Sequence, residues 1–199
     1  MSWLLLLAAY LTGATPTSYI AGRIRGIDLR RHGSGNLGAT NAFRVLGWKA
    51  AVPIFIVDIA KGWFPTACFP LWDGRAAPEW ALAYGAAAIV GHVFSVYVRF
   101  RGGKGVATGA GVFLALAPLA VLVCLVLWLS IVFATGYVSV ASIAAALLLP
   151  AVVYATRGAG PVLWVGVALA AFVILAHRSN IRRLRCGEEH RFRRKAAAR

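Results

Sequence analysis

The chain has 199 residues, of which 60% are hydrophobic and only 14% are charged. Soluble domains hold about half apolar and about a quarter charged residues, so this composition excludes a soluble enzyme with one buried core. It also excludes an intrinsically disordered chain, which carries far less apolar surface. Long apolar runs form helices in a bilayer, because no water is present there to satisfy backbone groups. The composition therefore predicts an all-α polytopic membrane protein.

The charge balance is one-sided. Lysine and arginine outnumber aspartate and glutamate by 21 to 6, which gives a formal net charge of +15. These charges lie in short gaps between apolar runs, so the expected partners are anionic membrane lipid and phosphorylated substrates, with no nucleic acid. The three cysteines (Cys68, Cys124 and Cys186) show no C-x-x-C spacing, and the sequence has no cluster of carboxylates. Neither a metal ion nor another cofactor is therefore expected.

The apolar runs can be assigned to spans in chain order. The first three predicted spans cover residues 2–22, 50–72 and 80–98, at about 20 residues per crossing. The N-terminus lacks the positive charges that open a signal peptide, so the first run is expected to be retained as a helix. The stretch between residues 105 and 154 is too long for one crossing, and three short crossings with breaks near Pro118 and Gly136 are predicted. With a last span over 161–176, about seven transmembrane helices are expected.

The basic residues predict the orientation, because lysine and arginine in short loops accumulate on the cytoplasmic side. Six of them lie in residues 23–49, three in 99–104 and nine from residue 177 onward, whereas the other two links hold one each. This pattern predicts an external N-terminus and a cytoplasmic C-terminus. Residues 1–189 form one predicted membrane domain, and 190–199 form a basic cytoplasmic tail that touches anionic lipid.

The first cytoplasmic gap, residues 32–44, is rich in glycine and polar residues. Glycines allow backbone N–H groups to turn toward an anion, and the helix that follows adds its own N–H groups. Arg44, one turn into that helix, can bind a phosphate with two hydrogen bonds. A lone glycine-rich turn would be structural, but this combination predicts a phosphate site with these candidate residues: Gly33, Ser34, Gly35, Asn36, Thr40, Asn41 and Arg44.

The second gap contains Gly102-Gly103-Lys104 shortly before a predicted helix that includes Thr108. It combines a flexible backbone, an ammonium group and a helix N-terminus, but it lacks the spacing of a P-loop, so ATP hydrolysis is not supported. The alternative is a positive-inside loop followed by a small-residue helix interface. We assign Arg99 and Arg101 to that alternative and Lys104 to a phosphate site.

The third gap places His177 and Asn180 three residues apart at a helix end, where both would face the same side. His177 is the best proton-handling candidate, and Arg183 is a candidate anion ligand. Three further polar residues within the spans are interpreted as structural: His92 would orient the second loop, and Asp58 and Lys61 would neutralise each other. Ser142 is placed to reach the same pocket as the loops, although a single intramembrane serine usually serves helix packing.

These three gaps resemble the three motifs of the bacterial acyl-phosphate:glycerol-3-phosphate acyltransferases, the PlsY family. The first motif is similar to residues 33–44, the second to residues 91–108, and the third to residues 177–189. Tyr137 to Ser142 and the Asp58-x-x-Lys61-Gly62 pattern also resemble family features. One departure is Ser95, where the family commonly has proline, and it affects the local kink rather than the chemistry.

The resemblance implies transfer of a fatty acyl group from acyl phosphate to the first hydroxyl of glycerol 3-phosphate. The products would be lysophosphatidic acid and inorganic phosphate, at the bacterial inner membrane with a cytoplasmic active site. No G-x-S-x-G or H-x-x-x-x-D motif is present, in agreement with an activated donor that needs no acyl-enzyme. The expected catalytic residues are Ser34, Arg44, Lys104, His177 and Asn180. The expected substrate-binding residues are Gly33, Gly35, Asn36, Thr40, Asn41, Gly102, Gly103, Thr108, Ser142, Arg183 and Glu189.

The mechanism expected from these residues is positioning plus electrostatic stabilisation, with loop N–H groups on the oxyanion. The hydroxyl proton would go either to His177 or to a substrate phosphate oxygen. The main alternative function is an anion or phospholipid transporter, but a transporter ordinarily needs repeats or paired half-helices. A purely structural subunit would leave the glycine-rich loops without a role. The acyl-chain preference and the oligomeric state stay open.

Overall fold

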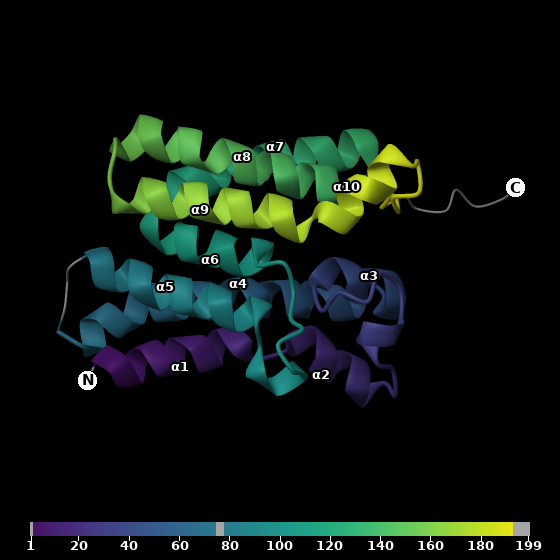
Figure 1. The fold of residues 1–199 in the computed structure, drawn as a ribbon, viewed down its shortest axis with the longest axis horizontal. Helices are drawn as coiled ribbons and strands as arrows, with labels where there is room; N and C mark the ends of the chain where they lie inside the picture. The colour runs from purple at the N-terminus through teal and green to yellow at the C-terminus, as the bar shows by residue number, and fades with distance from the viewer. Residues whose placement is uncertain (1, 75–77, 193–199) are drawn as a thin grey trace, which may run out of the picture. The chain divides into compact units, whose positions relative to one another are not determined.

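The structure is a computed structural model that describes residues 2–74 and 78–192, and the described residues contain helices and no strand. The chain divides into two compact units, residues 1–118 (unit 1) and residues 119–199 (unit 2), and each is considered by itself. Unit 1 contains α1 (Ser2–Ala14), α2 (Thr17–Ile24), η1 (Leu29–Arg31), α3 (Ala39–Leu46), α4 (Trp48–Trp72), α5 (Pro78–Val93), η2 (Val96–Val98) and α6 (Val106–Leu116) (Figure 1). Unit 2 contains α7 (from Pro118 to Thr135), α8 (Val138–Arg157), α9 (Pro161–Ala176) and α10 (Arg178–Arg185).

Small residues allow the helices of unit 1 to approach closely. A Cβ added at Gly13 of α1 would overlap the backbone of Ala88 in α5. Likewise, a Cβ at Gly111 of α6 would overlap the backbone of Ile59 in α4. Close backbone contact at small residues is how helices pack when lipid supplies no hydrophobic driving force between them.

The first apolar run is broken rather than continuous. Helices α1 and α2 are bent by 43° at Thr15–Pro16, where proline cannot donate a backbone hydrogen bond to continue the helix. The carbonyls at this break are satisfied by other elements: Ser95 Oγ donates to Ala14 O, and Lys61 Nζ donates to Thr15 O at 3.0 Å. Irregular backbone at membrane depth is tolerated where protein groups satisfy it in this way.

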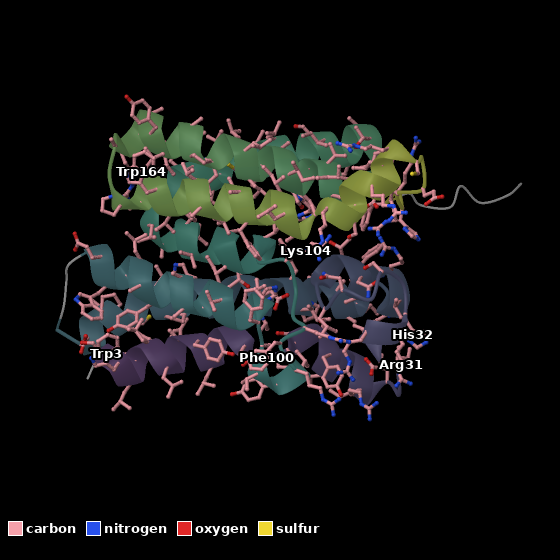
Figure 2. All side chains as sticks on the ribbon, viewed as in Figure 1. Trp3, Arg31, His32, Phe100, Lys104 and Trp164 are labelled. Carbon is pink, nitrogen blue, oxygen red and sulfur yellow. The ribbon has the colours of Figure 1, made fainter. Side chains whose placement is uncertain are left out.

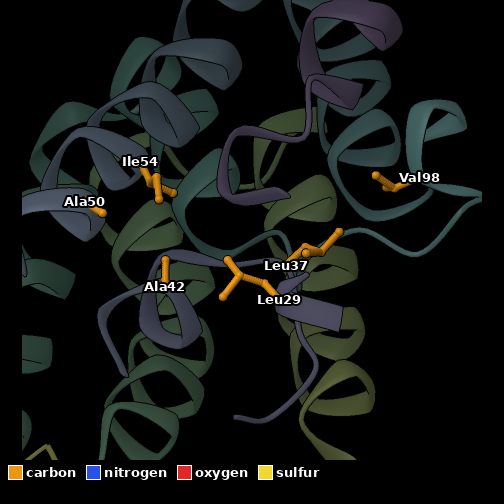
Figure 3. Close-up of a cluster of buried hydrophobic side chains, with 6 residues drawn as sticks. All are labelled: Leu29, Leu37, Ala42, Ala50, Ile54 and Val98. Atoms are coloured by element: carbon orange, nitrogen blue, oxygen red, sulfur yellow. The ribbon is translucent and has the colours of Figure 1, made fainter. Parts of the chain in front are cut away.

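A small hydrophobic cluster supports the loops at one end of unit 1 (Figure 3). It gathers side chains from η1, the first motif loop, α3, α4 and η2: Leu29, Leu37, Ala42, Ala50, Ile54 and Val98. Each of these residues is at most 7% exposed. The first motif loop therefore folds on a packed base and not as an isolated turn.

Unit 2 is built from three long helices and a bent continuation. Helices α9 and α10 are bent by 52° at His177, which ends one helix and begins the other. Beyond α10 the chain returns to the turn between α7 and α8, where the Phe192 N–H donates to Gly136 O at 2.6 Å. The residues from 193 onward, most of the predicted basic tail, lie outside the described residues.

The helix boundaries confirm the predicted breaks near Pro118 and Gly136, where α6, α7 and α8 are separated. Length and hydropathy support four membrane-crossing helices among the described residues, or six if each bent pair is one span. Helix α6 has 11 residues, so it is about 16 Å long, against a hydrocarbon core of about 30 Å. The predicted count of about seven and the orientation stay predictions.

Candidate active site

The first motif loop is organised around the side chain of Asn41, which is 1% exposed. Its Oδ1 accepts the Ser34 backbone N–H at 2.9 Å, and its Nδ2 donates to Leu29 O and His32 O. Gly33 has a φ of +61°, and a Cβ there would overlap Asn41 Oδ1. Asn41 was expected to contact substrate. In the structure its amide instead holds the loop in shape, because a buried amide must use its hydrogen bonds where protein partners exist.

The remaining polar side chains of the first motif, in the loop and in α3, are more accessible. Ser34, Thr40 and Arg44 are exposed, and Asn36 is half-buried. One Arg44 guanidinium nitrogen lies 3.4 Å from Asn41 Oδ1, so the buried amide also orients the arginine. The loop and α3 therefore present a hydroxyl and a guanidinium on a rigid frame, which is the chemistry that binds a phosphate.

The carboxylate that precedes this loop is neutralised locally. Asp28 accepts the Arg30 backbone N–H and lies 2.7 Å from the Arg30 guanidinium. The Arg30 side chain lowers the pKa of Asp28 to about 2. Asp28 thus stays ionised and paired near neutral pH, and its charge does not oppose an anion at the neighbouring loop.

The second motif loop is fastened to the end of α5. The Gly102 N–H donates to Val93 O at 2.9 Å, and the Gly103 N–H donates to His92 O at 3.1 Å. These N–H groups therefore satisfy the terminal carbonyls of a helix, and the expected contact of Gly102 and Gly103 with substrate stays a prediction. Thr108, also expected to contact substrate, is fully buried in the first turn of α6.

The two loops of unit 1 lie side by side. A Cβ added at Gly103 would lie 3.0 Å from Leu37 O of the first loop and would overlap the His92 imidazole. This close approach requires glycine at position 103, and it holds the partly exposed Lys104 beside the first loop (Figure 2). The His92 ring is itself buried, 3.9 Å from Asp58 Oδ1, and Lys61 Nζ lies 2.8 Å from the same oxygen.

The variant Gly103→Ala is expected to reduce turnover, because the added methyl group displaces the loop that carries Lys104. Overpacking of this kind costs about 1–3 kcal/mol, so thermal stability should also fall modestly. The matched control is Gly160→Ala, where an added Cβ meets nothing within 4 Å. Steady-state kinetics of both purified variants would check this. Equal activity of the two variants would show that the tight Gly103 contact is unimportant.

In unit 2, His177 is 4% exposed and lies at the bend between α9 and α10. Its Nδ1 lies 2.7 Å from Val173 O. A carbonyl oxygen only accepts, so Nδ1 carries the hydrogen, and in the neutral ring Nε2 bears the lone pair. The contact with Val173 therefore fixes the tautomer that a proton-accepting histidine needs.

Asn180 and Arg183 are held by the carboxylate of Glu189. Glu189 Oε1 accepts from Ser139 Oγ at 2.9 Å and from Asn180 Nδ2 at 2.6 Å, and Oε2 accepts from Arg183 Nε at 2.7 Å. Burial raises the pKa of Glu189. The hydrogen bonds from Asn180, Arg183 and Ser139 and the charge of Arg183 together lower this pKa by more than burial raises it, so it lies below its ordinary value. The oxygens of Glu189 thus serve protein donors, and its expected role as a substrate ligand stays a prediction.

Two side-chain contacts of unit 2 were not predicted from the sequence. Trp128 Nε1 donates to Ser142 Oγ at 3.2 Å, so the candidate Ser142 has a protein partner. Arg191 Nε donates to the Tyr137 hydroxyl at 2.9 Å and lies over its ring at 5.0 Å. Neither pair follows a local spacing rule, and only the return of the chain after α10 brings Arg191 to Tyr137.

Comparisons with known proteins agree with the three motifs. A sequence model of the family named glycerol-3-phosphate acyltransferase matches residues 3–187. A glycerol-3-phosphate acyltransferase of Geotalea daltonii is 42% identical over 191 residues, covering 96% of this chain and 97% of the relative. One from Trichlorobacter lovleyi is 45% identical over 186 residues, covering 93% and 94%.

Solved structures give the same result. The crystal structure of PlsY (YgiH), an integral membrane glycerol 3-phosphate acyltransferase in its glycerol 3-phosphate form, matches with a TM-score of 0.91 and 36% identity over 96% of each chain. Its lysophosphatidic acid form matches with a TM-score of 0.87 and 35% identity, covering 96% of this chain and 94% of that one. Together with its apolar helices, these matches make the chain a multi-pass membrane protein that belongs to the glycerol-3-phosphate acyltransferase family.

Proposed function

We propose that this acyltransferase takes its acyl group from acyl phosphate and transfers it to the sn-1 hydroxyl of glycerol 3-phosphate. The products are 1-acyl-glycerol 3-phosphate and inorganic phosphate, which makes the reaction the first step of phospholipid synthesis. The observation that carries the proposal is the close approach of the two motif loops in unit 1, where Gly103 lies against Leu37. These two loops and the start of α3 carry an ammonium, a guanidinium and a hydroxyl, which suit phosphate-bearing substrates.

The reaction balances without a covalent enzyme intermediate. The hydroxyl oxygen of glycerol 3-phosphate attacks the acyl carbonyl carbon, the carbon–oxygen bond to phosphate breaks, and inorganic phosphate leaves. Acyl phosphate is a mixed anhydride with a good leaving group, so the enzyme needs to orient the substrates and stabilise charge. This requirement agrees with the absence of a serine elbow from the sequence.

The proposed roles can be assigned within each unit. In unit 1, Arg44, Lys104 and Ser34 bind substrate phosphate and stabilise the negative charge that develops in the transition state. The N–H groups of Gly102 and Gly103 bond to α5, so this stabilisation is assigned to the cations. In unit 2, His177 Nε2 and a substrate phosphate oxygen are the two acceptors for the hydroxyl proton, and Asn180 supplies a polar group beside His177.

We further propose that the loops face the cytoplasm of the bacterial inner membrane, because they carry most of the basic residues. The family match favours the enzyme over the anion or phospholipid transporter considered from the sequence. Acyl phosphate and glycerol 3-phosphate are then the substrates, and the membrane is the source and destination of the acyl chain.

The donor can be tested with purified protein in detergent, given palmitoyl phosphate with and without glycerol 3-phosphate. Phosphate release that depends on glycerol 3-phosphate, with an equal amount of lysophosphatidic acid, is expected. Parallel reactions with acyl-CoA and acyl carrier protein as donors should give no product. Equal activity with either thioester would contradict the acyl-phosphate assignment while leaving the acyltransferase family intact. NMR of the product would establish whether position one carries the acyl group.

A further inference from the structure

The segment from Phe94 to Arg101 connects α5 to the second motif loop and passes beside the junction of α1 and α2 (Figure 1). Its first two residues are fixed by hydrogen bonds to α1. The Tyr10 hydroxyl donates to Phe94 O at 2.8 Å, and Ser95 Oγ donates to Ala14 O. Ser95 has a φ of −67°, the value that proline would impose, so its replacement of the family's usual proline keeps the local backbone.

Two consecutive residues in this segment have an unusual backbone conformation. Arg99 and Phe100 have φ values of +57° and +59°, a region that non-glycine residues rarely adopt. The Phe100 N–H donates to Ser95 O at 2.8 Å, which holds the turn closed. Conformations of this kind persist only where the surrounding structure imposes them, and they often mark a functional position.

The result of this conformation is a segment that buries Ser95 and Val98 and exposes its aromatic residues. Val98 is 1% exposed and belongs to the buried cluster of unit 1, whereas Phe94, Tyr97 and Phe100 are 49%, 55% and 61% exposed. Arg99 and Arg101, on either side of Phe100, are exposed as well. In water, three aromatic rings on one short turn would be an unfavourable surface.

The position and chemistry of this surface identify its partner. The segment overlaps the end of the candidate membrane span of residues 79–98 and continues to residue 101. Tyrosine and other aromatic rings at such an end favour the lipid headgroup layer, and arginines beside them pair with lipid phosphates. The net charge of +15 adds a general attraction to anionic lipid.

We propose that residues 94–101 form an interfacial anchor, in which Tyr97 and Phe100 insert among lipid headgroups and Arg99 and Arg101 contact lipid phosphates. The left-handed pair keeps Phe100 directed outward, away from the cluster that holds Val98. Gly102 and Gly103 follow directly and are bonded to α5, so the anchor holds the Lys104 loop at the level of the headgroups. The anchor is independent of which acyl donor the enzyme uses.

Site-specific quenching tests the anchor. Phe100→Cys would be made in a background with Cys68→Ala, Cys124→Ala and Cys186→Ser, labelled with bimane and reconstituted in phosphatidylcholine–phosphatidylglycerol vesicles. Lipids carrying a nitroxide near the headgroup should quench this label more than lipids carrying it near the chain end. Val126→Cys, in the middle of α7 and 66% exposed, is the deep control and should show the opposite order. Quenching by aqueous iodide with none by either lipid would overturn the proposal.

A second variant tests the same idea without a label. Phe100→Asn should fold normally, because asparagine tolerates the left-handed conformation better than phenylalanine does. Its turnover in detergent should equal that of the natural protein, whereas its KM for acyl phosphate in vesicles should rise several-fold. An unchanged KM in vesicles would contradict the anchor. In the labelled Phe100→Cys protein, quenching that depends on protein concentration and not on the lipid label would indicate a contact between copies. That result would also overturn the proposed anchor.

Discussion

Lys104→Ala is expected to lower kcat/KM by about 10²–10³-fold, equivalent to about 2.7–4 kcal/mol of transition-state stabilisation. Lys104 follows a glycine pair whose N–H groups are bonded to α5. The backbone therefore cannot replace the ammonium as a donor to the developing charge. The loop is held against the first motif loop at Leu37, so the lysine acts from a fixed position. Steady-state kinetics with both substrates varied would measure the effect.

The matched control is Lys49→Ala, which removes an exposed lysine near the start of α4 and lowers the net charge equally. Its kcat/KM should stay close to that of the natural protein. Lys104→Arg should recover only part of the activity, because a guanidinium has a different shape and hydrogen-bonding geometry. If Lys104→Ala retained turnover within a factor of a few, the assignment of Lys104 to the reaction would be wrong.

The second large effect is expected for the buried ion pair of α4. Asp58→Asn should destabilise the protein by about 3–5 kcal/mol, because it leaves the Lys61 charge buried without its counter-ion. The side chains of Lys61 and Asp58 are only 5% and 3% exposed, and their charged atoms lie 2.8 Å apart. Lys61 also satisfies the Thr15 carbonyl at the α1–α2 break. Thermal unfolding in one detergent would give the difference.

Two further variants separate the ion pair from its neighbours. The double variant Asp58→Asn with Lys61→Met should recover part of the loss, because the buried charge is gone while the Thr15 carbonyl loses Lys61 and keeps the Thr17 N–H. Thr17→Val leaves the ion pair in place but removes the hydrogen bonds from the Thr17 hydroxyl to Asp58 and to Thr15 O, and it should cost about 1 kcal/mol. An Asp58→Asn protein as stable as the natural one would show that the pair does not hold the break.

Much of the helical layout could be predicted from local sequence. Apolar runs bounded by glycine, proline or arginine end where α4, α7, α8 and α9 end, because these residues stop helices or stay out of lipid. The break between α1 and α2 was not predicted, although Pro16 marks it. A proline in an apolar run is tolerated or not according to whether other helices satisfy the freed carbonyls, and here Ser95 and Lys61 do so.

In the motif loops, the kind of substrate could be predicted from the residue types, but the partner of each residue could not. Their residue types predicted phosphate chemistry, since glycine, lysine, arginine and asparagine in short gaps are typical of anion sites. The structure assigned the roles differently within each loop. Asn41 and Glu189 bond to protein groups, and the Gly103 N–H caps α5. A sequence names donors and acceptors but does not say which partner each one meets.

The class of protein, the approximate helices, the three polar loops and the kind of substrate they suit could be predicted without a structure. These follow from hydrophobicity, charge and residue chemistry, which act over one or two turns of chain. Three features needed the folded chain to be seen: Gly103 lies against Leu37, Phe100 is exposed in a left-handed conformation, and Glu189 orients Asn180. Such contacts join residues from different elements, and they depend on how buried polar groups find partners when the helices pack.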